Sequence, residues 1–581
     1  MSEVLGDVLL DQRGEALVCK LSDSRSRPRL TALLRRVSKG SGYKVDGPFL
    51  VLDIRTALAL KSEASSVPLR WSEEAAGWVD NFAAGYAGLN EARRRLWQLR
   101  QPGVAKHTLC DYTGRDALDP HQLVAVAAMI DPYIAGICLF DEQGVGKTVM
   151  AIHAYDRLRQ IGQGDTALIF APKNMLEEWK KDFRRFMGEK YAVRTITGSR
   201  GQKYDELMSN ADVYVTNYET AHLFEQPLRS FLLRKPGRVV LVVDESFFVK
   251  NRETRRAAAV RRLRHLCSRC WVLCGTPAPN NALDVVHQFD VADSGVTFAG
   301  VQFPKDPGSL RRTIKETVEH RGIYLRRLKS DVLPDIPQKR FEQVSVPMEL
   351  EQGRLYADTL RRLVDDVGST DDQTFKKQLT TFLARRMALF ELCSHPGQVL
   401  RTYEGLPAKH AALDGLLDEL ITKRGEKVVL WSFFRYSLDR LILRYARFGP
   451  VRLDGSVTDV RKRAEAIRRF QEDDETMLFV ANPAAGGAGI TLTRSRIAVY
   501  ESFPVQTAHY LQSIDRIHRR GQTRETHYYF LLCQNTIEEE EYDRLLTKER
   551  YSLELFGDPE PETITREIFL ADLLRALRRL G

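Results

Sequence analysis

The chain has 581 residues, of which 43% are hydrophobic and 28% charged, which is typical of a soluble globular protein and excludes a wholly disordered chain. At roughly 150 residues per domain, this length predicts about four structural units. The longest tight apolar run covers residues 239–243, far short of the roughly 18 residues that a membrane-spanning helix needs, so a membrane protein is not expected.

Lys and Arg number 87 against 77 Asp and Glu, a formal net charge of +10. This mild excess suits a polyanionic partner such as nucleic acid, although a solvated basic surface would have the same composition. The eight cysteines are scattered, which indicates reduced thiols rather than a disulfide framework. Residues 1–20 carry Glu3, Asp7 and Asp11 and lack the pattern of a secretion signal, so we expect a cytoplasmic (nucleoid-associated) or nuclear protein.

Residues 1–105 are mixed in pattern and are predicted to form a small α/β accessory region. Residues 20–39 are basic, residues 45–60 indicate a strand followed by a helix, and residues 71–100 have a helical pattern. The arginines between 25 and 36 suggest a module that grips DNA, and a purely structural brace explains the same sequence equally well. Both interpretations stay open at this point.

Two later blocks, residues 106–300 and 406–546, alternate short apolar runs with helical stretches. The runs lie at 137–140, 167–170, 213–215, 239–243 and 270–274 in the first block, and at 428–431, 451–453, 477–480, 497–500 and 528–532 in the second. Strands of this length, apolar on both faces and separated by helices, predict parallel sheets with helices on both sides.

Two further regions are predicted to be helical. Residues 301–405 are expected to form a helical insertion and linker, because charge-rich helical sequence dominates there. Residues 547–581 are expected to form a C-terminal tail whose amphipathic helix at 564–580 packs on the body of the protein.

The sequence DEQGVGKT at 141–148 follows an apolar run and precedes a helical one, which is the context of a phosphate-binding loop. Gly144 and Gly146 would let backbone N–H groups surround the phosphates at the start of the helix. Lys147 would neutralise charge on the β- and γ-phosphates, and the Thr148 hydroxyl would be a ligand of Mg²⁺.

Asp244 and Glu245 follow the apolar run at 239–243, and carboxylates at the C-terminal end of a parallel strand lie where such sheets bind ligands. Asp244 could hold Mg²⁺, and Glu245 could polarise an attacking water. In the second block, residues 512–522 place Arg516 and Arg519 three positions apart, which predicts that both lie on one helical face. Arginines of this kind stabilise the charge that develops on a γ-phosphate.

In order and spacing, these motifs resemble those of the Swi/Snf (Snf-two) ATPases of helicase superfamily two, over about residues 118–546. The phosphate loop has this family's Asp-Glu-x-Gly-x-Gly-Lys-Thr form, which accounts for Asp141 at its first position. Further matches are the glutamine motif at 119–122, motif Ia at 171–174 with 178–179, motif Ib at 197–198, residues 216–219, motif II at 244–246 with 250–251, motif III at 275–277 with 280–281, the family stretches at 325–332 and 393–396, motif IV at 428–433, residues 452–456, motif V at 485–490 and motif VI at 512–522.

The resemblance implies roles for individual residues. Those implied to act in catalysis are Lys147, Asp244, Glu245, Arg516 and Arg519, with Thr148 and Asp244 as the ligands of Mg²⁺. Those implied to bind ATP are Gln122 as the adenine reader, Gly144, Gly146, Lys147, Thr148, Gly487 and Gln512. Those implied to contact nucleic acid are Lys173, Trp179, Thr197, Thr216, Asn217, Arg452, Gly486 and Thr491.

The implied fold is α/β: two tandem RecA-like parallel-sheet lobes with a helical insertion, beside the accessory region. The implied function is that of a monomeric ATP-dependent translocase on double-stranded DNA, which remodels DNA or DNA-bound protein complexes without extensive strand separation. A strand-separating or RNA-directed helicase is the alternative within enzymes, and a nucleotide-gated DNA-binding scaffold is the alternative outside them.

The sequence departs from the family pattern at two positions. Phe247 stands where relatives often have the His of Asp-Glu-Ala-His, and Thr491 stands where motif V usually has Asn. The first puts the coupling of hydrolysis to lobe closure in doubt, and the second is expected to have a mild effect. No chromatin-reader sequence flanks the motor, so a dedicated nucleosome remodeller is not favoured.

Overall fold

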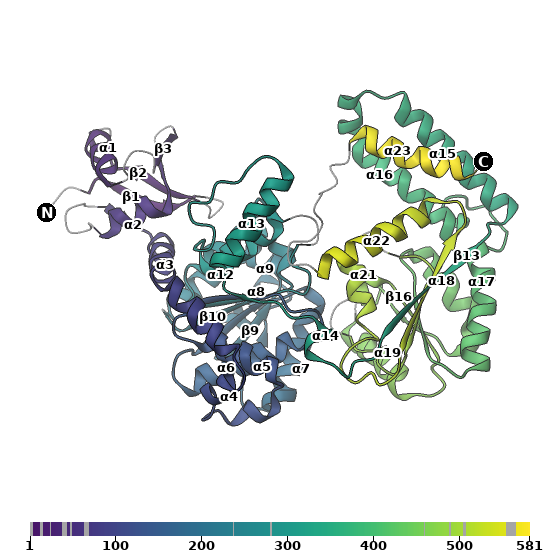
Figure 1. Cartoon of the computed structure of the whole chain (residues 1–581), viewed down its shortest axis with the longest axis horizontal. Helices are drawn as coiled ribbons and strands as arrows, with labels where there is room; N and C mark the ends of the chain where they lie inside the picture. The colour runs from purple at the N-terminus through teal and green to yellow at the C-terminus, as the bar shows by residue number, and fades with distance from the viewer. Residues whose placement is uncertain are drawn as a thin grey trace. The chain divides into compact units, whose positions relative to one another are not determined.

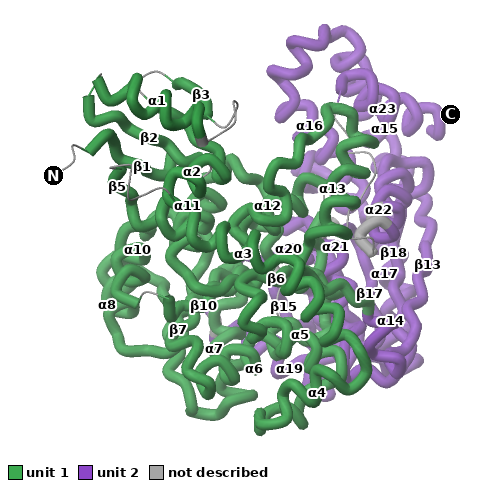
Figure 2. Tube along the Cα trace, turned by 60° about the vertical axis from the view of Figure 1, so that its left-hand side comes forward, with its two compact units in different colours: residues 1–328, 554–560 green, residues 329–553, 561–581 purple. Residues whose placement is uncertain are grey.

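The chain forms two compact units in the computed structural model, unit 1 ending at Leu328 and unit 2 beginning at Lys329 (Figure 2). The structure describes residues 4–11, 16–23, 25–37, 43–46, 49–62, 69–235, 237–278, 282–457, 459–486, 490–503, 507–553 and 565–580. None of the helices in these ranges is both long and apolar enough to cross a lipid bilayer.

Unit 1 begins with a small module, a five-stranded sheet in the order β3-β4-β2-β1-β5 (Figure 1). Its elements are β1 (Gly6–Leu10), β2 (Leu17–Leu21), α1 (Ser26–Val37), β3 (Tyr43–Asp46), β4 (Phe49–Leu52), α2 (Ile54–Ser62) and β5 (Leu69–Trp71). The buried leucines of α1, Leu30 and Leu34, pack with those of α2 and with the strands in one apolar cluster. The expected small α/β accessory region is confirmed.

The helix α3 (Glu73–Leu99) joins this module to the rest of unit 1. The ring of Trp78 stacks on that of His265 with centroids 4.9 Å apart, and its Nε1 donates to the carbonyl of Ser294 at 2.8 Å. A Cβ at Gly77 would lie 2.4 Å from the carbonyl oxygen of His265. Only glycine at this position therefore lets α3 approach the backbone of His265 so closely. The module is therefore braced against the larger sheet of unit 1.

That larger sheet has seven parallel strands in the order β12-β6-β11-β10-β7-β9-β8. The strands are β6 (Gly136–Leu139), β7 (Thr166–Phe170), β8 (Val193–Thr195), β9 (Val213–Thr216), β10 (Val239–Asp244), β11 (Arg269–Leu273) and β12 (Tyr324–Leu325). The helices are α4 (Val104–Thr108), α5 (Pro120–Ile130), α6 (Lys147–Gln160), α7 (Leu176–Met187), α8 (Arg200–Met208), α9 (Tyr218–Leu223), α10 (Glu225–Leu233), α11 (Arg255–Arg264), α12 (Leu283–Asp293) and α13 (Pro307–Arg321). All six residues of β10 are buried, as a strand covered on both faces requires.

Unit 2 contains six parallel strands in the order β13-β18-β17-β14-β16-β15. They are β13 (Lys339–Val346), β14 (Val428–Trp431), β15 (Val451–Leu453), β16 (Leu478–Ala481), β17 (Ile497–Tyr500) and β18 (Thr526–Cys533). The helices are α14 (Lys329–Val332), α15 (Leu350–Gly368), α16 (Asp372–Ser394), α17 (Ala408–Leu417), α18 (Arg435–Arg444), α19 (Val460–Glu472), α20 (Pro483–Gly486), α21 (Thr507–Ile514), α22 (Ile537–Leu553) and α23 (Arg566–Arg579). The prediction of two parallel α/β blocks is confirmed.

The prediction of a helical insertion at 301–405 is only partly right, because two strands in this region complete the sheets. β12 pairs with β6 in unit 1, and all eight residues of β13 pair with β18 in unit 2. β12 has only two residues, and β13 (KRFEQVSV) is rich in polar side chains because it forms one edge of its sheet. Neither gives the apolar signal of a central strand.

The C-terminal helix packs as predicted. Phe569, Leu573 and Ala576 of α23 are buried in a cluster with apolar side chains of α15 and α16, within unit 2.

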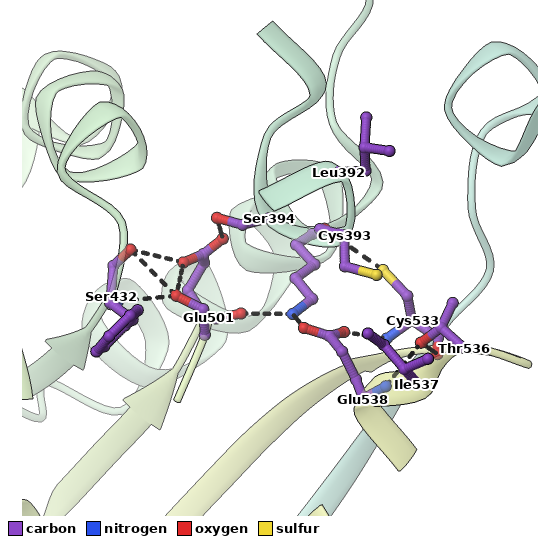
Figure 3. A network of polar contacts seen from close by, with 12 residues as sticks. Leu392, Cys393, Ser394, Ser432, Glu501, Cys533, Thr536, Ile537 and Glu538 are labelled. Carbon is purple, nitrogen blue, oxygen red and sulfur yellow. Dashed lines mark hydrogen bonds and ion pairs between the residues drawn. The ribbon is translucent and has the colours of Figure 1, made fainter. Parts of the chain in front are cut away.

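A buried polar network ties the helices of unit 2 to the C-terminal ends of its strands (Figure 3). The carboxylate of Glu501, just after β17, accepts hydrogen bonds from Ser394 at 2.5 Å and from Ser432 at 2.7 Å. The ammonium of Lys409 on α17 donates to the carbonyl of Glu501 at 2.7 Å and pairs with Glu538 on α22 at 2.6 Å. Burial alone would lower the pKa of Lys409, but its acidic neighbours, Glu538 first and Glu501 among the others, together outweigh burial and raise that pKa, so the lysine stays charged.

Lys409→Met should destabilise unit 2 by about 3–5 kcal/mol, because it leaves the carboxylate of Glu538 buried without its cation. Urea unfolding of the full chain, combined with hydrogen exchange in α17 and α22, measures this loss. Lys423→Met is the matched control, because Lys423 pairs with Glu419 at the surface. Equal stability of the two variants would contradict the structural role of the buried pair.

Candidate active site

The loop at 141–148 connects β6 to the N-terminus of α6. Gly144 and Gly146 have φ of 85° and 96°, a conformation that residues with a Cβ rarely adopt. A Cβ at Gly146 would also lie 2.4 Å from Nε2 of Gln122. Lys147 curls over the loop, with Nζ donating to the carbonyl of Asp141 at 2.8 Å, and Thr148 lies half-buried in the first turn of α6. This is the conformation of a phosphate-binding loop.

Gln122 lies against this loop, buried in the first turn of α5. Its Nε2 donates to the carbonyl of Val145 at 3.2 Å, and its Oε1 accepts from the backbone N–H of Asp119 at 3.0 Å. The structure therefore places Gln122 beside the phosphate loop, and its role in reading adenine stays a prediction.

A cavity of about 960 Å³ opens in unit 1 beside the start of α5. Its walls include the cationic side chains of Arg100, Lys106, Arg115, Arg326 and Arg327 and the ring of Tyr324. A volume of this size can hold a drug-sized ligand or a nucleoside. His121, which also lines the cavity, contacts the carbonyl of Val145 in the phosphate loop at 3.0 Å through Nε2.

Asp244 ends the central strand β10 and is buried. Its Oδ2 accepts from Nε1 of Trp179 at 2.8 Å, and its Oδ1 accepts from the backbone N–H of Glu245 at 2.9 Å. Burial raises the pKa of Asp244, while Trp179 and the nearby charge of Lys147 act in the opposite direction. The Tyr218 hydroxyl also donates to the main-chain carbonyl of Asp244.

Glu245 has φ 49° and ψ 54°, the left-handed conformation that is costly for a non-glycine residue and recurs at functional sites. Its Oε1 accepts from Nε2 of Gln143 in the phosphate loop at 3.3 Å. The next residue, Ser246, donates to Oε1 of Gln288 at 2.5 Å, and Gln288 in turn donates to the carbonyl of Pro277 in motif III. Motif II is therefore bonded both to the phosphate loop and, through Gln288, to motif III.

Two residues predicted to contact nucleic acid do not reach the surface. Trp179 is 1% exposed, and its only polar atom bonds the carboxylate of Asp244. Thr216 is fully buried at the end of β9, where its hydroxyl donates to the carbonyl of Ile196 at 3.0 Å. Contact of either residue with nucleic acid therefore stays a prediction. Trp179 and Tyr218 instead hold Asp244, and a buried aromatic residue with a polar atom was the sequence signal that could have found this role.

The other residues of that set differ in their exposure. Lys173 and Thr197 are exposed after β7 and β8, and Asn217 is half-buried, its side chain capping the N-terminus of α9. Arg452 is already held by Asp439 and Asp454 at 2.5 and 2.6 Å. Gly486 ends α20, Thr491 is half-buried, and Gly487, predicted to bind ATP, lies outside the described residues.

The two arginines of unit 2 lie together, although not on a helix as predicted. α21 ends at Ile514, so Arg516 and Arg519 lie on the turns that follow it. Nη1 of each donates to the same acceptor, the carbonyl of Ile490, at 3.1 Å. Arg516 also donates from Nε to the carbonyl of Gln512, which is itself buried. The structure thus pairs the guanidinium groups through a main-chain carbonyl rather than through helical spacing.

The segment that joins the units is bonded within unit 1 at its first residues. The guanidinium of Arg327 pairs with the fully buried carboxylate of Asp141, Nε lying 2.9 Å from Oδ1. The backbone N–H of Glu142 donates to the carbonyl of Arg327 at 2.9 Å. The phosphate loop and the end of unit 1 are therefore in direct contact.

The next residues of this segment are bonded within unit 2. Nζ of Lys329, 3% exposed, lies 2.5 Å from Oδ1 of Asp515 and donates to the carbonyl of His518 at 3.1 Å. Burial alone would raise the pKa of Asp515, but Lys329 and Lys339 lower it. Asp515 immediately precedes Arg516, so Lys329 supports the turn that carries the two arginines.

The donors at the phosphate loop fit a hard cation. The Thr148 hydroxyl and the Asp244 carboxylate offer oxygen atoms, which Mg²⁺ prefers, and the burial of Asp244 favours a cation beside it. Together, one parallel-sheet lobe with a phosphate loop and paired carboxylates, and a second with paired arginines, define a tandem RecA-like core of the kind that binds and hydrolyses nucleoside triphosphates.

Comparison with known proteins identifies the family. The model of the SNF2-related domain matches residues 121–398, and that of the helicase conserved C-terminal domain matches residues 409–521, together about two thirds of the chain. The chain belongs to the SNF2-related family of helicase-like ATPases. The comparisons match neither model to residues 1–120, so the module and α3 lie outside both.

The chain is similar to several curated relatives. It is 25% identical to the SWI/SNF-related matrix-associated actin-dependent regulator of chromatin subfamily A containing DEAD/H box 1 of Xenopus tropicalis, over 90% of this chain and 57% of that protein. It is 27% identical to an uncharacterized ATP-dependent helicase of Mycoplasma genitalium, over 71% of this chain and 39% of that protein. The chain spans about half the length of the curated relatives it matches. The chain is also similar to a solved structure, the Sulfolobus solfataricus SWI2/SNF2 ATPase core domain. The match covers 76% of this chain and 91% of the solved chain, with 22% sequence identity and a TM-score of 0.35.

Trp179→Phe should raise the Mg²⁺ concentration needed for half-maximal ATP turnover about ten-fold, because Asp244 loses a hydrogen bond of the strength given to charged acceptors. Mg²⁺-dependent binding of a fluorescent ATP analogue should shift in parallel, while affinity for nucleic acid stays unchanged. Trp97→Phe is the control, since Trp97 is 64% exposed. Weaker nucleic-acid binding with an unchanged Mg²⁺ requirement would restore the original interpretation of Trp179.

Proposed function

We propose that the chain is an ATP-dependent translocase on double-stranded DNA, which remodels DNA or protein–DNA complexes without extensive strand separation. The observation that carries the proposal is the set of bonds in unit 1 that places the phosphate loop and the two carboxylates at one edge of a parallel sheet. Ligands of parallel α/β sheets bind at this C-terminal edge.

Each residue of that set has a defined task in this proposal. Lys147 releases the loop carbonyls and takes the β- and γ-phosphates, which the backbone N–H groups of the loop surround. Glu245, close to the loop through Gln143, orients the attacking water. Thr148 and Asp244 would hold Mg²⁺, which neutralises phosphate charge when bound.

The base and ribose of ATP would occupy the cavity beside α5, since His121, which lines this cavity, contacts the phosphate loop at the carbonyl of Val145. The cationic walls of this cavity suit a ligand with an anionic tail, and Tyr324 offers an aromatic face. From unit 2, Arg516 and Arg519 would stabilise the charge that develops on the γ-phosphate.

The net charge of the chain and its family support DNA as the substrate. The chain is basic, and Lys173 and Thr197 are exposed after parallel strands of unit 1, where they can contact a phosphate backbone. The name of the Xenopus relative assigns that protein to chromatin. The two units would bind the DNA backbone in alternation during each ATP cycle. This alternation would move the motor along one strand.

The test compares ATP turnover with duplex DNA, single-stranded DNA and RNA, for the full chain and for Lys147→Ala and Glu245→Gln. Duplex DNA should stimulate turnover most, and both variants should lose the stimulated activity while keeping the thermal stability of the parent chain. Lys173→Ala is the matched lysine control, which should lower DNA affinity without abolishing turnover at saturating duplex.

Unchanged turnover in both variants would overturn the assignment of the active site. Stimulation by RNA or by single strands above that by duplex would favour the strand-separating or RNA-directed helicase instead. Tight nucleotide binding without turnover under any condition would favour the nucleotide-gated scaffold.

A further inference from the structure

One face of the N-terminal module carries concentrated positive charge. Arg25, Arg29, Arg35 and Arg36 are all exposed, on α1 or directly before it. Residues 24–37 contain no acidic side chain, and the nearby Asp23 caps α1 by accepting from the backbone N–H of Ser26 at 2.7 Å. The arginines therefore project from a helix that has no acidic side chain of its own.

The spacing of these arginines follows from the amphipathic pattern of α1. Leu30 and Leu34 are buried against the sheet, so the opposite side of the helix faces outward. Positions 25, 29 and 36 fall on that outer side at helical spacing, and Arg35 lies beside them. Arg29 and Arg36 are about 10 Å apart along the helix axis, so both can reach phosphates of one DNA strand.

The module is also fastened to the part of unit 1 that contains the seven-stranded sheet, so that a contact made by α1 is transmitted to that sheet. Besides the contacts of Trp78, Nη2 of Arg55 on α2 donates to the carbonyl of Ala299 at 2.9 Å. Arg229 of α10 pairs with Glu74 at the start of α3. Phe82 of α3 lies in an apolar cluster with Val296 and Ala299.

We propose that the outer face of α1, defined by Arg25, Arg29, Arg35 and Arg36, is a second DNA-binding surface that holds the duplex backbone independently of the motor motifs. This inference rests on the proposed function and adds to it a site for the track. Arginine suits this role because its guanidinium stays charged and bonds phosphate oxygens in bidentate fashion. The contact reads no sequence, so it can persist or re-form as the motor advances.

The experiment uses the full chain with all four arginines changed to Glu, and a second set with the same four changed to Gln. The matched control reverses four exposed arginines of unit 2, at positions 354, 361, 362 and 401, for the same change in net charge. Binding to a blunt-ended duplex without nucleotide is measured over a range of KCl concentrations, and ATP turnover over a range of duplex concentrations.

The α1 variants should bind duplex at least about ten-fold more weakly at low salt, and the slope of log affinity against log salt should fall by about 3–4 if all four contact phosphates. The duplex concentration for half-maximal turnover should rise by a similar factor, while turnover at saturating duplex and without DNA stays unchanged. The Gln set should show the same reduction in slope, and it decides the outcome if the Glu set unfolds.

Unchanged duplex binding by the α1 variants would overturn the proposal, because it would show that these arginines do not contact DNA. An equal loss of binding in the control would also overturn it, because the loss would then follow from net charge alone. If the parent chain shows no duplex stimulation, the proposed function itself fails. If the parent is stimulated and the α1 variants match it, only this second surface fails.

Discussion

A carboxylate that is buried away from water needs a cation or several hydrogen-bond donors, and this requirement organises the two parallel sheets of the protein. Asp141 and Asp515 lie buried in different units, and each is paired with a cation of the same short segment, Arg327 for the first and Lys329 for the second. Asp244 is supported by Trp179 and by the backbone of Glu245 rather than by an ion pair. Two of these carboxylates are neutralised within the protein, and the third keeps a raised pKa that a bound cation would relieve.

The sequence was informative wherever a pattern is local. Apolar runs predicted the central strands, because a strand covered on both faces is almost continuously apolar. The glycines predicted a loop whose N–H groups can surround phosphates, and in the structure Gly144 and Gly146 have positive φ. Edge strands such as β13 were not predicted, since their exposed side permits charged residues. The burial of Trp179 and Thr216 was not predicted either, because the order of motifs indicates which residues lie near a site and not which way a side chain points.

The long-range ion pairs could not be predicted from the sequence for a similar reason. The stretch at 325–332 could be recognised as typical of the family, but 186 positions separate Arg327 from Asp141 and Lys329 from Asp515, and no local pattern links them. Phe247, where the family often has histidine, packs on the apolar core of unit 1 with its ring centroid 4.7 Å from that of Phe248.

In the proposed mechanism, one hydrolytic event uses residues from both units. It is tested most directly by Arg519→Ala, with the exposed neighbour Arg520→Ala as control, measured for ATP affinity and for DNA-stimulated turnover. We predict that Arg519→Ala lowers turnover by about a thousand-fold or more while ATP affinity stays close to that of the parent chain, and that the control behaves like the parent. Unchanged turnover in Arg519→Ala, or a loss of ATP affinity as large as the loss of turnover, would contradict it.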